Sequence, residues 1–321
     1  MARRTTLKIV LEPSSGSRFQ PTGFPDLGAA IFQKPAPDGG WTSCLLVESV
    51  QSMANHAEGL TWDYGANDQR AELKGLPFVR VEDSAGTFLS ASRLEAHRLA
   101  SAYVMNGTVG EVTGLEFLRQ KLGVSLKGKD AKPLDRLALN RTVYNLDPLG
   151  LIHGVFFARN EWAWQPKIAR ALTIFVEAYD VQTAVSGGIK TDRVRSDASA
   201  LVSGKSAGKS ATTEGYGMVP HSRTEYTARD IIAHVNVDHE QIRSYGLGEP
   251  AVELLEALVD FELAHLFEEG LRLRTACDLV VKDVQGGELA TTERAISRLG
   301  GAIAAAGLPP ATLTTVVFGG R

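Results

Sequence analysis

Six strand-like or helix-like stretches follow one another in the order β-α-β-β-α-β, and this order constrains the fold of the 321-residue chain more than any other feature. Strands are recognised by alternation and β-branched residues, and helices by apolar residues on one face. The six stretches are 6–11, 44–60, 168–185, 218–238, 251–271 and 278–282. This is the ferredoxin-like arrangement that RNA-recognition modules also use. We therefore predict an α+β fold with a ferredoxin-like, RRM-like palm (βαββαβ).

Residues 61–166 interrupt this order with helix-like stretches, the first of which opens on the capping-box spacing Ser92-Arg-Leu-Glu95. We predict that 61–166 is a large, mostly helical insertion into a palm formed by 1–60 and 167–321. Within the palm, 186–215 is rich in Ser, Gly, Ala, Lys and Thr and has almost no large apolar residues. Because such a segment cannot pack a core, we expect a flexible basic loop there.

Net charge and cysteine content limit the possible environments. A net charge of -3 and a pI of about 6.2 exclude a wholly basic surface, so polyanion binding would need a local basic face. Cys44 and Cys277 lie far apart within apolar stretches, which indicates buried thiols in a reducing compartment. No apolar run approaches the ~20 residues of a membrane span. We therefore expect a cytoplasmic protein with no membrane contact, no cofactor and no metal.

Three patterns give only weak support for enzymatic chemistry. The segment Ser203-Gly-Lys-Ser-Ala-Gly-Lys-Ser210 repeats Gly-Lys-Ser, but it lacks the earlier glycine and the following apolar helix of a phosphate-binding loop. His234, Asn236 and Asp238 share one strand face, where a polar sheet surface is favoured over half of a metal site. Asp26 or Asp38, each in a loop, could assist RNA cleavage, although loop aspartates are more often turn formers.

Three groups of cationic and hydrogen-bonding side chains point to RNA. Arginines neutralise phosphates, and Gln, Ser and Asn give uncharged hydrogen bonds to phosphate or sugar oxygens. Phenylalanine rings can stack on bases. We predict a positive groove lined by Arg18, Phe19, Gln20, Gln51, Ser52, Asn55, Arg93, His97 and Arg98. Lys190 and Arg193 belong to the flexible basic loop, which we expect to become ordered on an RNA phosphate backbone. In the alternative, Arg93 and Arg98 pair with acidic residues at the surface and the phenylalanines belong to the core.

The same segments resemble a known family. Arg18-Phe-Gln-Pro-Thr-Gly-Phe-Pro-Asp-Leu-Gly28, Leu46-Val-Glu-Ser-Val-Gln-Ser-Met-Ala-Asn55 and Ser92-Arg-Leu-Glu-Ala-His-Arg98 are similar to the CRISPR-associated RAMP superfamily Cascade backbone subunit, the seventh Cas family. The resemblance is to its type I-G (formerly I-U) version in particular. It extends to 185–190 and 225–238 and so spans most of the chain.

The resemblance implies a non-catalytic protein whose copies polymerise along a CRISPR RNA. It implies that 61–166 forms fingers and that 186–215 forms a thumb, unless that loop is disordered. The implied partners are CRISPR RNA, target DNA in the guide-target heteroduplex, neighbouring copies and other Cascade subunits. Base pairing would supply specificity, so the protein would hold the RNA backbone without reading its sequence. The alternatives are an RNA-cleaving subunit like the type III relatives, which use a loop aspartate, and a metal-dependent hydrolase.

Overall fold

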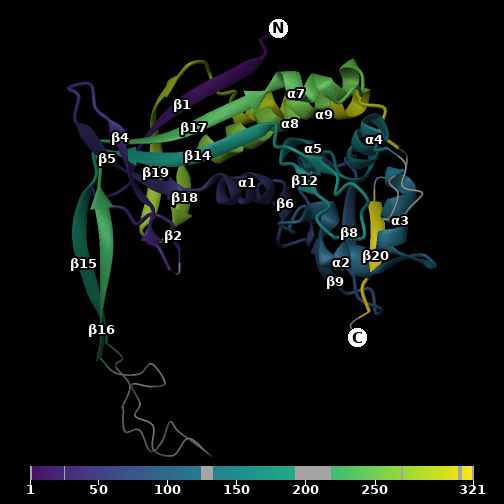
Figure 1. The fold of residues 1–321 in the computed structure, drawn as a ribbon, viewed down its shortest axis with the longest axis horizontal. Coiled ribbons are helices and arrows are strands. Elements are labelled where there is room, and N and C mark those ends of the chain that lie inside the picture. The colour runs from purple at the N-terminus through teal and green to yellow at the C-terminus, as the bar shows by residue number, and fades with distance from the viewer. Residues whose placement is uncertain are drawn as a thin grey trace, which may run out of the picture.

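The computed structural model describes residues 2–24, 26–123, 133–191, 218–268, 270–309 and 313–319. The chain forms an arch (Figure 1). A large sheet makes the top and one side, and a second body of short helices and strands makes the other side. Among the residues described, no helix is both long and apolar enough to cross a membrane.

The large sheet has seven strands, each antiparallel to its neighbours. Their order is β18-β19-β1-β17-β14-β5-β4. The bounds are β1 (Arg4–Pro13), β4 (Ile31–Pro35), β5 (Trp41–Glu48), β14 (Leu172–Tyr179), β17 (Asp230–Asp238), β18 (Leu271–Arg274) and β19 (Cys277–Gln285). This large curled antiparallel sheet with its helices confirms the predicted mixed α+β class.

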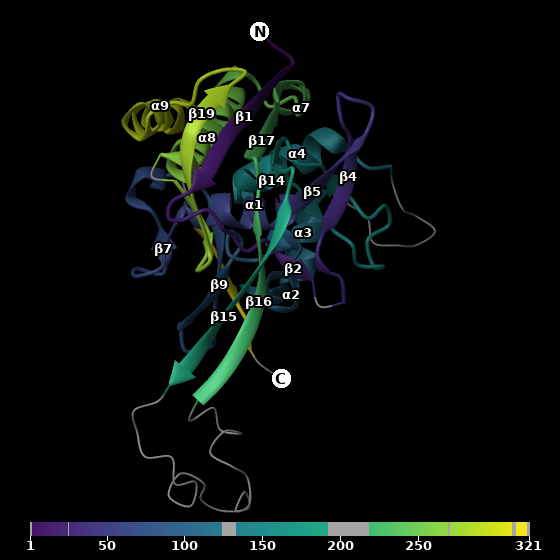
Figure 2. The same ribbon diagram turned by 90° about the vertical axis from the view of Figure 1, so that its left-hand side faces the viewer.

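One face of this sheet is covered and the other is open. In β1, Leu7 and Ile9 are buried, while Lys8 between them is exposed. In β17 the same alternation leaves His234 and Asn236 on the open face. Helices α8 and α9 lie on the covered side (Figure 2), where their apolar residues and those of the strands leave water together. The helices of this body are α1 (Val50–Gly59), α7 (His239–Ser244), α8 (Glu249–Phe267) and α9 (Thr292–Ala305).

The helix predicted at 44–60 is wrong at its start. Residues up to Glu48 form strand β5, and α1 begins only after Ser49, whose Oγ accepts a hydrogen bond from Ser52 N at 3.3 Å. Leu45 and Val47 are buried at alternate positions, which is the period of a strand. The helical spacing within 44–48 is therefore coincidental.

The helix predicted to begin at Ser92 is also wrong. The chain there forms turns, the 3-10 turn η2 (Arg98–Ala100) and the short helix α2 (Ala102–Asn106). Ser92 is fully buried; its Oγ donates to Asp147 Oδ2 at 2.5 Å and accepts from Val79 N at 3.2 Å. Glu95 accepts a hydrogen bond from Ser90 Oγ at 2.6 Å. Tertiary contacts thus use both side chains of the supposed capping box.

The second body contains a five-stranded sheet in the order β11-β10-β20-β8-β9. Its strands are β8 (Phe78–Glu82), β9 (Phe88–Ala91), β10 (Thr108–Val109), β11 (Val112–Thr113) and β20 (Leu313–Val317). Its helical elements are η1 (Ala71–Leu73), α3 (Gly114–Leu122), α4 (Arg136–Leu146) and α5 (Leu149–Ile152). It also has two two-stranded ladders, in which β6 (Trp62–Asp63) pairs with β7 (Asp68–Gln69) and β12 (Val155–Phe156) pairs with β13 (Lys167–Ile168).

Strand β20, close to the C-terminus, lies parallel to β8 in the middle of this second sheet. Assigning all of 167–321 to the palm is therefore wrong for this strand. The physical reason is burial: Val316 is fully buried and belongs to the main core. The described part of 61–166 holds a sheet as well as helices.

A long hairpin extends from the large sheet, away from the rest of the molecule (Figure 1). Strand β15 (Gln182–Thr191) pairs antiparallel with β16 (Met218–Thr227) along its ten residues. The first part of the predicted loop, 186–191, is therefore strand, while 192–215 lies outside the described residues. A shorter ladder, β2 (Gly23–Phe24) with β3 (Gly28–Ala29), lies within the Arg18 to Gly28 segment.

A candidate nucleic-acid interface

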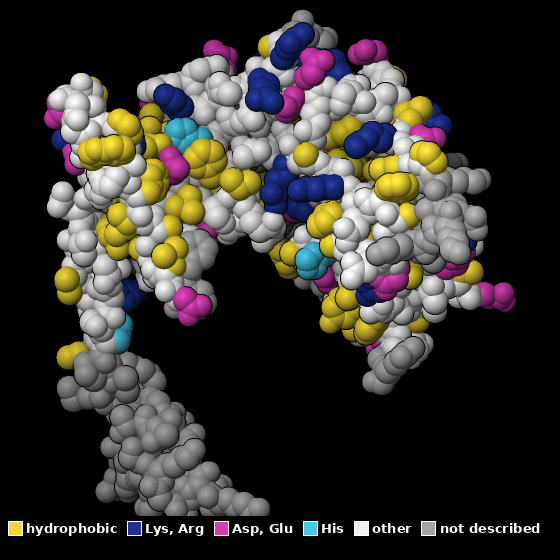
Figure 3. All heavy atoms as spheres, viewed as in Figure 1, with side chains coloured by type: hydrophobic (Ala, Val, Ile, Leu, Met, Phe, Trp, Pro, Cys, Tyr) yellow, Lys and Arg dark blue, Asp and Glu magenta, His cyan; other side chains and the backbone are white. Residues whose placement is uncertain are grey.

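The concave side of the arch holds a hollow where the body of the large sheet meets the second body. Its volume is about 450 Å³, and its walls come from α1, the turn at 96–98, the β12–β13 ladder and the residues up to Arg170. Lys and Arg side chains gather at the centre of this side, over the region between α1 and β12 (Figure 3). A concave site with this charge attracts phosphate groups.

Besides Arg98, two cations line the hollow, Lys167 and Arg170. Arg170 donates a hydrogen bond through Nη2 to Gln51 Oε1, while its Nε is buried and has no partner among the described residues. Burial lowers the pKa of Arg170, and nearby Arg98 lowers it further, yet an arginine remains charged at neutral pH. Lys167 is exposed, with Nζ 5.7 Å from the centroid of the Phe156 ring. Within the described part of the chain, neither cation forms an ion pair with a carboxylate.

A buried charge network forms the floor of the hollow. Arg98 is 4% exposed and grips both carboxylate oxygens of Glu58, with Nε 2.6 Å from Oε1. Beside it, His153 Nε2 lies 2.9 Å from both carboxylate oxygens of Glu262. Burial opposes the charge of His153, but the carboxylates of Glu262 and Glu58 outweigh it and raise the pKa of this histidine. The network therefore pairs two cations with two carboxylates beneath the site.

Backbone conformations that are uncommon for L-residues hold this floor in place. Arg98 itself has φ +50° and donates through Nη1 to Gly154 O at 3.0 Å. Gly154 has φ +80°, and a Cβ there would lie 2.7 Å from Ile168 O. Glycine is therefore required where this turn passes so close to β13.

The structure brings together part of the predicted groove. Gln51, His97 and Arg98 all line the hollow. Asn55 is exposed one turn along α1 and accepts a hydrogen bond from Gln51 Nε2 at 3.2 Å. Ser52 is partly buried next to Gln51, and its backbone N–H donates a hydrogen bond to Ser49 Oγ at the start of α1.

Arg18, Phe19 and Gln20 lie elsewhere, beside the root of the hairpin. Phe19 and Tyr226 exchange two backbone hydrogen bonds of 2.9 Å, and Phe19 is 1% exposed, so the prediction that its ring stacks on RNA is wrong. The side chain of Arg18 is half exposed and pairs with Glu225 at 3.4 Å. Gln20 is held through its backbone N–H, which donates to Ala276 O at 2.7 Å.

The two arginines predicted on an exposed helix face are in fact buried. Arg93 has a fully buried side chain, with Nε 3.6 Å from Asp147 Oδ1 and Nη2 donating a hydrogen bond to Pro77 O at 3.1 Å. A phosphate cannot reach this guanidinium, so the prediction for Arg93 is wrong. Nε and Nη2 of Arg98 donate hydrogen bonds to Glu58, and Nη1 donates to Gly154 O, so Arg98 supports the site from below. Lys190 lies in β15, and Arg193 lies outside the described residues.

Sequence reasoning missed Lys167 and Arg170, the two Lys or Arg side chains of the hollow that form no ion pair with a carboxylate among the described residues. They precede a clear strand, β14, and neither belongs to a recognisable motif. The available signal was their spacing, two cations three residues apart at the entry to a buried strand. No cluster of three or more His, Cys, Asp or Glu side chains able to hold a metal ion occurs among the residues with described positions.

The fold defines a mixed α+β protein with a large curled antiparallel sheet, and its sequence shows the family. The chain belongs to the family described as CRISPR-associated protein GSU0053, whose model matches residues 6–183. This match includes the residues on α1, the turn at 96–98 and the stretch from Lys167 to Arg170 that line the hollow. No curated protein matches the sequence.

Two solved structures resemble the chain at low identity. A chain of a "CRISPR RNA-guided surveillance complex, pre-nicking" has 9% identity and a TM-score of 0.39, covering 93% of this chain and 87% of that one. The crystal structure of Thermofilum pendens Csc2 has 11% identity and a TM-score of 0.31, covering 95% of this chain and 71% of that one.

Proposed function

We propose that this chain is a non-catalytic subunit that binds CRISPR RNA along the concave side of its arch, in a type I Cascade effector complex. The observation that carries the proposal is the hollow lined by Gln51, His97, Lys167 and Arg170, in a chain of a CRISPR-associated family. Lys167 and Arg170 suit phosphates, and the neutral hydrogen-bonding groups of the hollow suit phosphate and sugar oxygens. Such contacts hold an RNA backbone without reading bases, and pairing with the target supplies specificity.

We also propose that the palm is ferredoxin-like. Strands β19, β1, β17 and β14 are adjacent in that order, with α1 between β1 and β14 along the chain and α8 between β17 and β19. This is the βαββαβ connectivity that supports the assignment. In this proposal 61–166 forms the fingers, the β15–β16 hairpin forms the thumb, and the chain is the type I-G version of the seventh Cas family.

The proposed partners are neighbouring copies of the chain, other Cascade subunits and target DNA in the guide-target heteroduplex, all in the cytoplasm. Exposed apolar side chains support contact with such neighbours. On the β15–β16 hairpin, Val185 and Ile189 are 82% and 60% exposed, and Trp41, beside the turn between β4 and β5, is 69% exposed. Large apolar groups left in water in this way mark surfaces that another molecule covers.

The test is binding of the purified chain to single-stranded RNA over a series of salt concentrations. Lys167→Ala and Arg170→Ala each remove one phosphate contact, and Lys74→Ala is the charge-matched control, because Lys74 is exposed outside the hollow. We expect each hollow variant to weaken binding of every RNA sequence alike and to reduce the slope of log K against log salt by about 0.7.

The control should leave both affinity and slope unchanged. Unaltered affinity and slope in both hollow variants would show that RNA does not lie in this hollow. A loss confined to one RNA sequence would contradict backbone binding, because phosphate contacts carry no sequence information.

A further inference from the structure

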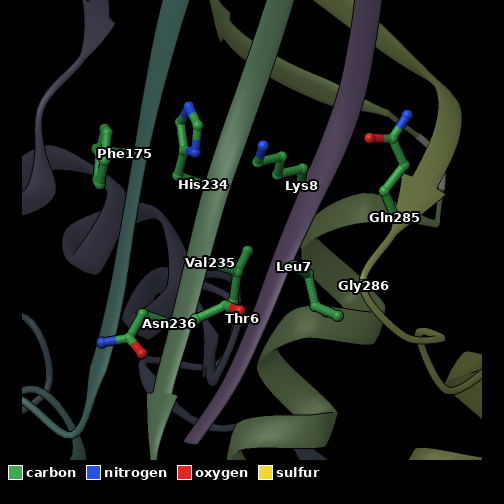
Figure 4. Close-up of a pocket in the computed structure, with 9 residues that line it drawn as sticks. All are labelled: Thr6, Leu7, Lys8, Phe175, His234, Val235, Asn236, Gln285 and Gly286. Atoms are coloured by element: carbon green, nitrogen blue, oxygen red, sulfur yellow. The ribbon is translucent and has the colours of Figure 1, made fainter.

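The open face of the large sheet carries a second polar pocket, apart from the hollow. Its volume is about 400 Å³, within the range of small-ligand sites. The side chains of Lys8, Phe175, His234, Asn236 and Gln285 stand on the side of the strands away from the helices (Figure 4). They come from four adjacent strands, β1, β14, β17 and β19.

Two rings form an aromatic wall of this pocket. Phe175 and His234 are stacked, with centroids 4.9 Å apart and planes 19° apart. Tyr179 O–H donates to Glu177 Oε2 at 2.7 Å, and its oxygen lies 2.7 Å from His234 Nε2. Because the hydroxyl has only one hydrogen, Nε2–H donates to it, which leaves Nδ1 as an acceptor. Burial lowers the pKa of His234 although Glu177 opposes this, so the ring is neutral and suited to stacking.

The remaining groups of the pocket have unused hydrogen-bonding capacity. Asn236 Oδ1 is buried and has no partner among the described residues, which is an unfavourable state for a buried acceptor. Gln285 Nε2 donates to Asp283 Oδ2 at 3.0 Å, which leaves its carbonyl oxygen available. Lys8 is exposed, and its amino group is directed toward His234 (Figure 4). The pocket thus offers several acceptors and one cation beside an aromatic wall.

We infer that this pocket binds an unpaired RNA base stacked on the Phe175–His234 wall, with adenine as the best-matched base. The amino group of adenine supplies the donor that Asn236 Oδ1 lacks, and an Asn amide is matched to the N6 and N7 edge of adenine. Uracil has no exocyclic amino group, and its single donor, N3–H, lies between two carbonyl oxygens that the acceptors of the pocket repel. Lys8 binds the adjoining phosphate.

This inference rests on the proposed function only in taking RNA as the ligand, and it adds base recognition, which the hollow lacks. One RNA strand can reach both sites. Phe175 follows Arg170 by five residues, roughly 17 Å at the rise of a strand. A strand of a few nucleotides covers that distance, with its backbone in the hollow and one base on the open face.

The experiment compares binding of the full chain to two labelled RNAs, a uracil decamer and the same decamer with one central adenine. We expect the adenine-containing RNA to bind more tightly. Phe175→Ala and His234→Ala should weaken its binding by about 5- to 150-fold, the range for losing one stacked base. Asn236→Leu should abolish the preference for adenine and keep the affinity for the uracil decamer.

Lys8→Ala, which changes an exposed side chain and leaves the core intact, should weaken both RNAs. The matched control is Gln33→Ala, an exposed amide on β4 of the same sheet, which should change neither. Equal affinity for the two RNAs, or a preference that survives in Asn236→Leu, overturns the base pocket. If Lys167→Ala and Arg170→Ala still weaken binding of both RNAs, RNA binding in the hollow is retained and only the base pocket is refuted. Absence of all RNA binding refutes both proposals.

Discussion

Replacing Arg98 with methionine tests whether the charge network supports the candidate RNA site from below. The substitution leaves Glu58 buried, at 3% exposure, without the guanidinium that binds both of its oxygens. Removing one partner of a buried ion pair costs about 3–5 kcal/mol, because the other charge stays buried and unpaired. At about 2–4 °C per kcal/mol for a chain of this size, the melting temperature should fall by roughly 6–20 °C.

The loss should depend on pH in a defined direction. Burial raises the pKa of Glu58 above its ordinary value of 4.5, and Arg98 acts against that rise. Without Arg98 the folded protein takes up a proton on Glu58 more readily than the unfolded chain does. Protonation therefore favours the folded variant at low pH, and this advantage is lost as the pH rises through the raised pKa. The difference in stability from the unmodified protein should be smaller at pH 5 than at pH 8.

The assay is thermal and urea unfolding of both proteins across this pH range. A double variant, Arg98→Met with Glu58→Leu, replaces the whole pair by apolar groups and should recover most of the lost stability. A loss below about 1 kcal/mol would contradict the assignment of Glu58 and Arg98 as a buried pair. So would a loss of equal size at pH 5 and pH 8, because an unpaired buried carboxylate must titrate.

Two further predictions concern Asp26 and the cysteines. Asp26 is exposed in its loop. We expect no cleavage of a labelled complementary RNA by a complex assembled with guide RNA and Mg²⁺. Regularly spaced cleavage that disappears in Asp26→Ala would instead show an RNA-cleaving subunit. Burial raises the pKa of Cys277 to about 11 and also raises that of Cys44, so neither thiol of the folded chain should react with a disulfide reagent at pH 8, whereas both should react in denaturant. Rapid labelling of the folded protein would show that these segments open to solvent.

The elements with strong periodicity could be predicted from the sequence. The open and covered faces of β17 follow from strict alternation of apolar and polar residues, and α8 follows from its dense apolar content. Strand β5 could not be found in this way, because Cys44, Leu45 and Val47 give an almost continuous apolar run that fits a helix or a buried strand equally well.

The candidate site was predictable only in part, because burial of charge is a tertiary property. Arg98 looks like a surface cation in the sequence, since its partner Glu58 lies 40 residues away. Arg93 also looks like a surface cation in the sequence, because its partner Asp147 is distant along the chain. Gln51 and His97 were found because polar amides and a histidine stood out on otherwise ordinary segments. Arg170 belongs to no motif in the sequence, and only the fold brings it within hydrogen-bonding distance of Gln51.

The central position of β20 in the second sheet has a consequence for the order of events during synthesis. Strands β8 and β10 flank β20, so this sheet lacks its middle strand until residues 313–317 have been made. Contacts between residues this far apart in sequence form late, and the unpaired edges they leave are prone to aggregation. The last strand of the large sheet, β19, ends at Gln285, so the large sheet can pair its strands before the second sheet, which waits for residues 313–317.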